Sequence, residues 1–315
     1  MHLFRTLVVG IISAGAAMVS AQEYPNAPIR LFTGTPGGGL DFAARLFAPR
    51  LSTAVGQTVV IENRGFVISP ETVAKAKPDG YTLLFFGSPF WLAPYLRTAP
   101  YDPIKDFAPI TLAVTSPDIL VVHPSVPVKN VKELIALAKS RPGELNYASS
   151  AIGAGSHLAG ELFKSLAQVN IVHIPYKGVT IALSSMIGGQ VQVMFATAGG
   201  VAQHIKSGRL RGLGVGSSER SPLVPDLPTV AASGLPGFQS VGIYGIFAPA
   251  GTPPAILSRL NQEFVRVLNQ AELRERLLSS GVEAVGNTPE HLAAAVKREM
   301  GTLGKLIKHL GITAD

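Results

Sequence analysis

Short apolar runs alternate with stretches of helical periodicity along most of this chain of 315 residues. Ile29–Thr33, 58–63 and 81–86 are predicted strands, and the last is nearly all apolar, as in strands buried on both faces of a parallel sheet. Residues 40 to about 54 have helical spacing and stand between the first two strands. This alternation predicts βαβ units, with largely parallel sheets covered by helices.

The alternation pauses where two apolar runs stand almost side by side. Only Thr115-Ser116-Pro117-Asp118 separates residues 110–114 from 119–122, and we interpret this place as the crossing from one lobe to another. A second series of strands and helices follows, and the run at 243–249 is interpreted as the return. The predicted fold is α/β, with two lobes around a central ligand cleft. One lobe would comprise residues 24–118 plus 249–315, and the other residues 119–248.

Two helix starts carry capping signals. Ser69 followed by Pro70 predicts the N-terminus of a short helix, and Thr288 followed by Pro289 predicts the N-terminus of the last helix. Apolar residues recur at helical spacing after Pro289 as far as Leu310, so we expect one continuous helix at the end of the chain.

The first 21 residues have the pattern of a secretory signal peptide. Arg5 precedes a short apolar core, and Val19-Ser20-Ala21 offers small residues where a signal peptidase reads. The core is too short to span a bilayer, so we predict cleavage after Ala21 and a periplasmic protein, with an uncleaved anchor as the alternative. The chain has no cysteine, which excludes disulfides, a lipoprotein cysteine and thiolate metal sites.

The net charge of the chain and its distribution indicate which class of partner to expect. The formal net charge is +7, but lysine and arginine are spread along the chain without a basic block. This argues against nucleic acid as a partner and favours small acidic molecules.

A glycine-rich turn, residues 35–41, follows the first predicted strand and opens the first helix. Gly34 and Gly39 have the separation of P-loop glycines, but Leu40-Asp41 stand where the loop needs lysine and serine or threonine. Phe42 stands where a dinucleotide-binding loop needs its third glycine. The turn therefore predicts no nucleotide and no cofactor.

The sequence also lacks the patterns of a nucleophilic site and of a metal site. Ala154 and Leu158 occupy the positions that must be glycine around a nucleophilic Ser156, so we interpret Ser156 as a helix cap. The histidines show no i, i+4 pair, and carboxylates are sparse in the segments near the cleft, which argues against a metal site and against acid–base catalysis.

Two glycine-rich turns remain, residues 35–41 and 149–156, one from each predicted lobe. Each opens a helix and can offer backbone N–H groups to an anion without a charged side chain. We interpret them as a site for a small carboxylate, the alternative being two ordinary strand-to-helix turns.

The sequence also resembles the Bug family, the periplasmic receptor subunits of tripartite tricarboxylate transporters. The resemblance covers essentially the whole chain after Ala21 and rests on many ordered motifs. These include Pro36-Gly37-Gly38-Gly39-Leu40-Asp41, Glu62-Asn63-Arg64, Pro78-Asp79-Gly80-Tyr81, Asp106-Phe107-Ala108-Pro109, Gly155-Ser156-His157-Leu158, Ile174-Pro175-Tyr176-Lys177-Gly178, Pro225-Asp226-Leu227-Pro228 and Ala248-Pro249-Ala250-Gly251.

The resemblance implies a two-lobed periplasmic binding protein fold of the class II type. It implies a non-enzymatic receptor that holds a small carboxylate largely through backbone N–H groups and waters, and delivers it to a membrane permease. We expect a monomer without metal. The ligand-binding residues that we predict are Thr35, Pro36, Gly37, Gly38, Gly39, Asp41, Ser88, Ser150, Gly155, Ser156, His157, Tyr176 and Lys177.

The chain departs from the family pattern in two loops. Gly65-Phe66-Val67-Ile68 and Val179-Thr180-Ile181 replace glycine-rich turns, and such bulkier loops could narrow the cleft or suit an aromatic or aliphatic acid. Two other functions stay open: a ligand sensor that docks on a signalling kinase, and a periplasmic enzyme on the same fold.

Overall fold

The computed structural model describes residues 24–314 apart from 35, 37–38 and 66. The predicted signal peptide and its cleavage point lie outside the described residues, as do Thr35, Gly37 and Gly38 of the predicted site.

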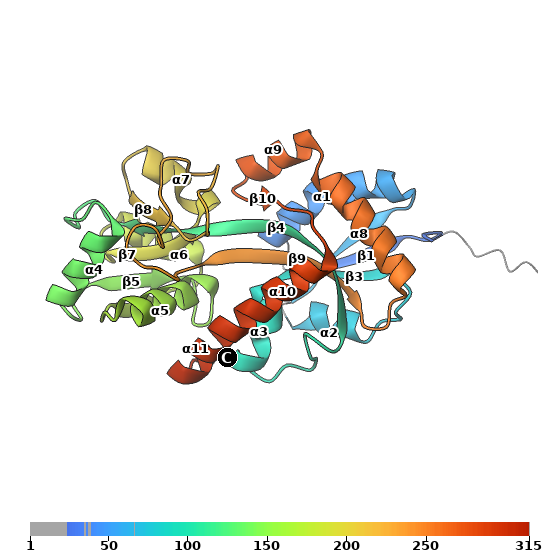
Figure 1. The fold of residues 1–315 in the computed structure, drawn as a ribbon, viewed down its shortest axis with the longest axis horizontal. Helices are drawn as coiled ribbons and strands as arrows, with labels where there is room; N and C mark the ends of the chain where they lie inside the picture. The colour runs from blue at the N-terminus through green and yellow to red at the C-terminus, as the bar shows by residue number, and fades with distance from the viewer. Residues whose placement is uncertain (1–23, 35, 37–38, 66, 315) are drawn as a thin grey trace, which may run out of the picture.

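The strands form one ten-stranded sheet that runs through the whole molecule (Figure 1). The order is β2-β1-β3-β9-β4-β7-β5-β6, and β10 and β8 pair with β4 beside this path. We call the part built on β1, β2, β3 and β10 the first lobe, and the part built on β5 to β8 the second lobe. The strands are β1 (Ile29–Thr33), β2 (Val59–Asn63), β3 (Thr82–Gly87), β4 (Phe107–Val122), β5 (Asn146–Ser149), β6 (Val172–Pro175), β7 (Val193–Thr197), β8 (Arg211–Val215), β9 (Val241–Pro249) and β10 (Glu283–Ala284).

In the first lobe, helices cover both faces of the sheet. Because successive side chains of a strand point to opposite faces, Leu31 packs with α1, α8 and α9, whereas Phe32 packs with α2, α3 and α10. The sheet is therefore buried on both sides, as its apolar strands predict. The helices are α1 (Gly39–Val55), α2 (Ile68–Ala74), α3 (Ser88–Leu96), α8 (Pro254–Leu268), α9 (Ala271–Ser279) and α10 (Pro289–Glu299).

The second lobe repeats this arrangement. Leu120 and Val122 of β4 face a core formed with α4 and α5, and Ile119 and Val121 face a core formed with α6 and α7. The helices are α4 (Val131–Ser140), α5 (Gly155–Ala167), α6 (Val179–Ile187) and α7 (Ala198–Lys206).

The two apolar runs predicted as separate strands are one continuous strand, β4, of 16 residues. The polar residues between them resemble a turn in the sequence, but distant segments supply their hydrogen bonds. Thr115 pairs with Glu283 of β10, Pro117 lies opposite Val241 of β9, and Asp118 bonds through its backbone to Ser240. The lobes therefore share one long strand and its partner β9, and the predicted lobe boundaries stay a prediction.

The end of the chain differs from the single helix expected. Thr288 caps α10 as predicted, because its side chain accepts a hydrogen bond from the His291 N–H. After Glu299 the helix widens into a π-helix, Met300–Gly304, and then continues as α11 (Lys305–Leu310). Leu306 of α11 packs in the α4 and α5 core, so the end of the chain contacts both lobes.

Ser69 is also not the cap that its position suggested. The N-cap of α2 is Val67, and the Ser69 hydroxyl donates to the Thr33 carbonyl at 2.8 Å instead. This bond ties α2 to the end of β1.

We predict that Gly160→Ala destabilises the protein by about 1–3 kcal/mol, because overpacking a tight contact forces its neighbours to move. A Cβ atom at Gly160 would lie 2.2 Å from the ring of Tyr147, which is buried. Urea unfolding should show a lower midpoint. Gly155→Ala in the same helix is the matched control, because its Cβ would meet nothing within 4 Å, and an equal loss in both variants would contradict the packing argument.

Candidate functional site

The carboxyl ends of strands from the two lobes point toward each other. β3 and β4 both run antiparallel to β9, and β7 runs antiparallel to β4. Gly87 at the end of β3 lies opposite Tyr244, which pairs with Val114, whereas Thr197 at the end of β7 lies opposite Asp118. From residue 114 to residue 118 is about 13 Å along a strand. Ligands of α/β proteins bind where strand ends meet in this way.

A cavity of about 180 Å³ lies between these strand ends. Its lining comes from both lobes and from the two shared strands, and none of the described lining residues carries a charge. They are Leu40, Ala43, Phe85, Val114, Ser116, Thr197, Gly199, Gly200, Tyr244, Ser280, Gly281 and Val282.

Two helices from opposite lobes begin at this cavity, α1 at Gly39 and α7 at Ala198. The first N–H groups of a helix have no partner inside it, and together with the helix dipole they favour an anion. At α7 the cap residue, Thr197, makes no side-chain hydrogen bond to these groups. Helix starts on two sides of the cavity therefore favour the binding of an anion in it.

Asp41 ties the start of α1 to the end of β2. It is 4% exposed, forms an ion pair with Arg45 at 3.0 Å and accepts a hydrogen bond from Asn63 Nδ2 at 2.9 Å. The same Asn63 amide donates to the Gly34 carbonyl. The carboxylate of Asp41 is therefore held by partners at both ends of this connection.

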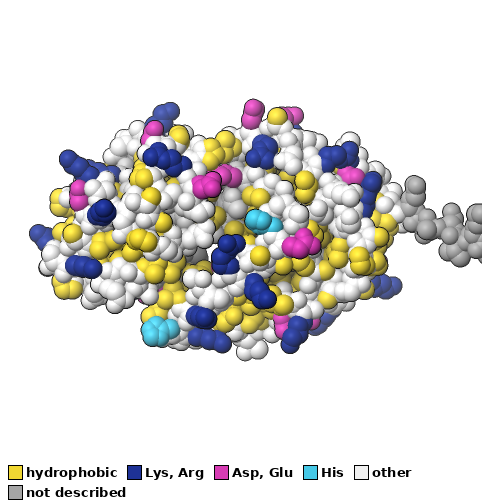
Figure 2. Space-filling model, in the orientation of Figure 1, with side chains coloured by type: hydrophobic (Ala, Val, Ile, Leu, Met, Phe, Trp, Pro, Cys, Tyr) yellow, Lys and Arg dark blue, Asp and Glu magenta, His cyan; other side chains and the backbone are white. Residues whose placement is uncertain are grey.

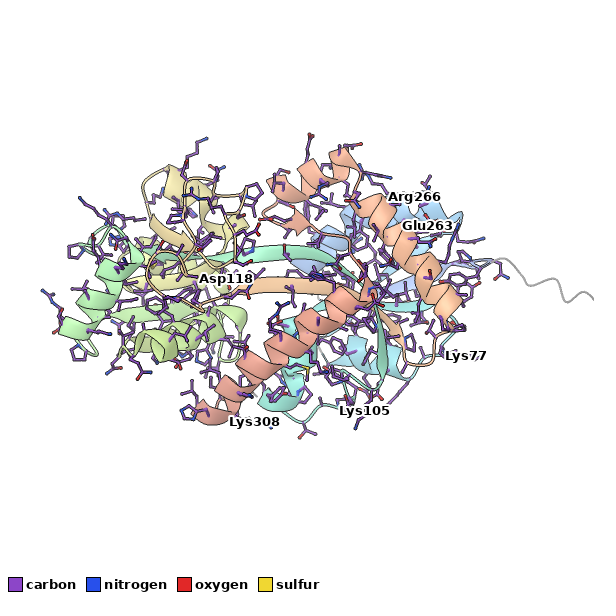
Figure 3. The ribbon with its side chains drawn as sticks, in the orientation of Figure 1. Lys77, Lys105, Asp118, Glu263, Arg266 and Lys308 are labelled. Atoms are coloured by element: carbon purple, nitrogen blue, oxygen red, sulfur yellow. The ribbon has the colours of Figure 1, made fainter. Side chains whose placement is uncertain are left out.

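Ser88, the first residue of α3, faces a carboxylate that the sequence analysis missed. Its hydroxyl donates to Glu299 Oε1 at 2.6 Å, and Trp91 Nε1 donates to Oε2 at 3.0 Å. Burial raises the pKa of Glu299 to about 7, although both hydrogen bonds oppose the rise. Burial also raises the pKa of Asp118, which lies where β4 passes between the lobes, to about 6 (Figure 3).

The second predicted turn is held by its own side chains. The Ser150 N–H donates to Ser156 Oγ at 3.1 Å, so Ser156 bonds back to the turn, while the N-cap of α5 is Ala154 and not Ser156. His157 is buried, accepts from the Gly153 N–H at 2.9 Å and stacks on His173 with ring centroids 4.0 Å apart.

The stacked histidines are kept neutral by their surroundings. Burial lowers the pKa of both imidazoles, that of His173 to about 4. The other face of the stack is Tyr147, whose hydroxyl donates to Glu161 at 2.7 Å. His157 therefore supports the turn before α5.

Two further predicted residues follow β6 in the second lobe. The Tyr176 N–H bonds to the Ser149 carbonyl at 3.0 Å and its ring packs partly into the α6 and α7 core, whereas Lys177 is exposed. In the first lobe, Pro36 is exposed and Gly39 is the first residue of α1.

None of the predicted residues that the structure describes lines the cavity. Leu40 does, between Gly39 and Asp41. Gly199 and Gly200 were not among the predicted site residues, although they repeat the strand–glycine–helix pattern of the first turn. The β5–α5 turn instead contacts α3, because a Cβ at Gly153 would lie 3.2 Å from Leu96. The predicted set of ligand contacts stays a prediction.

The lobes touch beside the cavity at two glycines. A Cβ atom on Gly281, whose φ is +85°, would lie 2.2 Å from the Cα of Gly199. The Ser116 hydroxyl donates to the Gly281 carbonyl at 3.1 Å, which holds this turn on β4.

Within the described part of the chain, no helix is long and apolar enough to cross a membrane. The same residues contain no group of three or more histidine, aspartate or glutamate side chains that could hold a metal ion.

Comparison with known proteins identifies one family. Residues 43–312 match the family described as "Tripartite tricarboxylate transporter family receptor". Protein BugT of Bordetella pertussis is 35% identical over 99% of this chain and 99% of its own length.

Solved structures agree with this result. Rpa4515 of R. palustris with adipate has 35% identity and a TM-score of 0.76, covering 92% of this chain and 99% of that one. MatC of Rhodopseudomonas palustris with bound malate has 30% identity and a TM-score of 0.73, covering 90% of this chain and 100% of that one.

We predict that Glu299→Gln stabilises the protein more at pH 8 than at pH 5, by roughly 2–3 kcal/mol. A carboxyl whose pKa rises on folding contributes stability at low pH that is lost as the pH rises through the folded value, here about 7. The neutral amide removes this loss. Unfolding of both proteins should be measured across this pH range, with Glu275→Gln, at an exposed position of α9, as the control. A pH-independent difference would contradict the argument.

Proposed function

Because the chain belongs to the tripartite tricarboxylate transporter receptor family, a family of solute-binding receptors and not of enzymes, we propose that it acts as such a receptor. After cleavage at Ala21, it would capture a small mono- or dicarboxylate between its lobes in the periplasm and deliver it to a membrane permease. Two of the similar structures are described with adipate and with malate, so acids of this size should be tested first.

One observation carries the proposal: helices from opposite lobes begin at the same uncharged cavity. Burying a carboxylate is costly unless several aligned donors replace its water. Backbone N–H groups at the starts of α1 and α7 are such donors, and as parts of helices they are already oriented toward the cavity.

The predicted turns would complete the ligand shell. We place the ligand carboxylate against residues 35–39 and the start of α7, with Ser150, Gly155 and Ser156 reached as the lobes close. The open space around Gly155 supports a close approach there. Closure would be a hinge motion about the shared strands β4 and β9, with the ligand favouring the closed state.

The first experiment is a thermal-shift screen of the purified protein with mono-, di- and tricarboxylates, followed by calorimetry of the hits. A ligand at 100 times its Kd should add about 2.7 kcal/mol to the free energy of unfolding, which raises Tm by a few degrees. Absence of saturable binding by every acid would contradict the receptor function for small carboxylates.

We predict that Gly200→Val weakens carboxylate binding at least tenfold, about 1.4 kcal/mol, because its side chain would occupy the approach to α7. A Cβ at Gly200 would meet only Thr197 Oγ1, at 3.5 Å, so the fold should tolerate it. Gln203→Val, at an exposed position of the same helix, is the matched control. Equal affinities for both variants would place the ligand elsewhere.

A further inference from the structure

A second cavity, of about 430 Å³, lies on the first lobe and shares no lining residue with the cavity between the lobes. It is bounded by α3, by the segment before β4, by β9 and by the end of α10. Its lining residues are Tyr95, Pro103, Ile104, Phe107, Pro109, Phe247, Ala293, Val296, Lys297, Met300 and Gly301.

The floor of this cavity is a packed aromatic cluster. Phe107 and Phe247 are almost fully buried, and Phe90 holds both, with ring centroids 4.6 and 5.2 Å away. On one side, the Tyr95 ring packs so closely on Gly304 that a Cβ there would lie 2.6 Å from it, and Lys308 Nζ lies 5.2 Å from the ring centroid. The floor and this wall are therefore formed before any ligand arrives.

The π-helix shapes the adjoining wall, since its Gly304 packs against the Tyr95 ring. Glu299, just before it, turns inward to Ser88 and Trp91, while Met300 and Gly301 line the cavity. A Cβ on Gly301 would meet nothing within 4 Å, so no packing contact fills this position. Single π-turns in longer helices occur frequently at functional sites.

Lys297 is the one charged residue among the described lining residues, and it is exposed at the mouth. Hydrophobic side chains on this face lie among Lys and Arg side chains (Figure 2). Lys105 and Lys308 lie on the same side of α10 (Figure 3). An ammonium group over an apolar floor suits a ligand with a negative head and an apolar body.

We propose that this cavity is a second binding site, for an amphipathic organic anion. An aryl or medium-chain alkyl carboxylate would pack its apolar body on Phe107 and Phe247 and meet Lys297 with its carboxylate. The volume is within the range of small-molecule sites, which are mostly apolar with a few placed polar groups. The site is independent of the carboxylate site proposed between the lobes.

The protein contains its own reporter for this site. Trp91 is the single tryptophan of the chain, and its ring centroid lies 6.1 Å from that of Phe247 in the cavity floor. A ligand seated on Phe247 should change the fluorescence of Trp91.

The test is a titration of the purified protein with 4-phenylbutyrate, read by Trp91 fluorescence and by calorimetry. We expect saturable binding at one site in the presence of excess adipate, and at least fivefold weaker binding of the neutral 4-phenylbutanol. Lys297→Met should weaken the binding of 4-phenylbutyrate at least fivefold, and Gly301→Leu should abolish it by filling the cavity. Arg298→Met, exposed and outside the lining, is the matched control and should leave binding unchanged.

Three results would overturn the proposal. They are no saturable binding to the unaltered protein, binding that both Lys297→Met and Gly301→Leu leave unchanged, and binding lost in Gly200→Val, which would place the probe between the lobes. The thermal unfolding midpoint of each variant shows whether it is folded. The first two results do not bear on carboxylate capture between the lobes, which the carboxylate screen and the comparison of Gly200→Val with Gln203→Val test separately.

Discussion

The antiparallel pairing of β4 with β9 is the interaction on which the rest of the structure depends. β4 extends from the first lobe into the second, and β9 pairs with it from residue 107 to residue 117. This ladder fixes the direction of every strand that joins it. As a result, the strands of the two lobes end toward each other, and the helices that follow them begin on either side of one gap. The position of the site is therefore set by the direction of the strands, and the side chains only line it.

The side chains that look most reactive support the backbone. Asp41 ties the start of α1 to Asn63 at the end of β2 and pairs with Arg45, and His157 holds the turn before α5 through Gly153 and His173. A site that binds an anion through N–H groups requires that those groups cannot move, since a flexible loop would lose entropy on binding. In the proposed receptor function, the polar network would contribute to affinity by limiting motion, even where it does not touch a ligand.

The sequence predicted the alternation of strands and helices and the start of α1 shortly after β1, because both are local patterns. It did not predict β4 as one strand, since the partners of Ser116 and Asp118 are Gly281 and Ser240, more than a hundred residues away. Ser88 and Glu299 are 211 positions apart, so no spacing rule could join them. The π-helix was hidden because Leu303 and Ile307 keep helical spacing across it. Gly199 and Gly200 were within reach, since they follow an apolar strand as Gly34 and Gly39 do.

The contact between Gly199 and Gly281 has a geometric consequence for the whole molecule. Here the backbones of the two lobes meet without a side chain between them, and the positive φ of Gly281 disfavours any other residue at that point. The lobes are therefore already in backbone contact at this point, and a further closing motion would have to pivot about it. A methyl group at either position would hold the two backbones further apart here. Two residues without side chains thus let the lobes approach each other beside the cavity more closely than side-chain packing would allow.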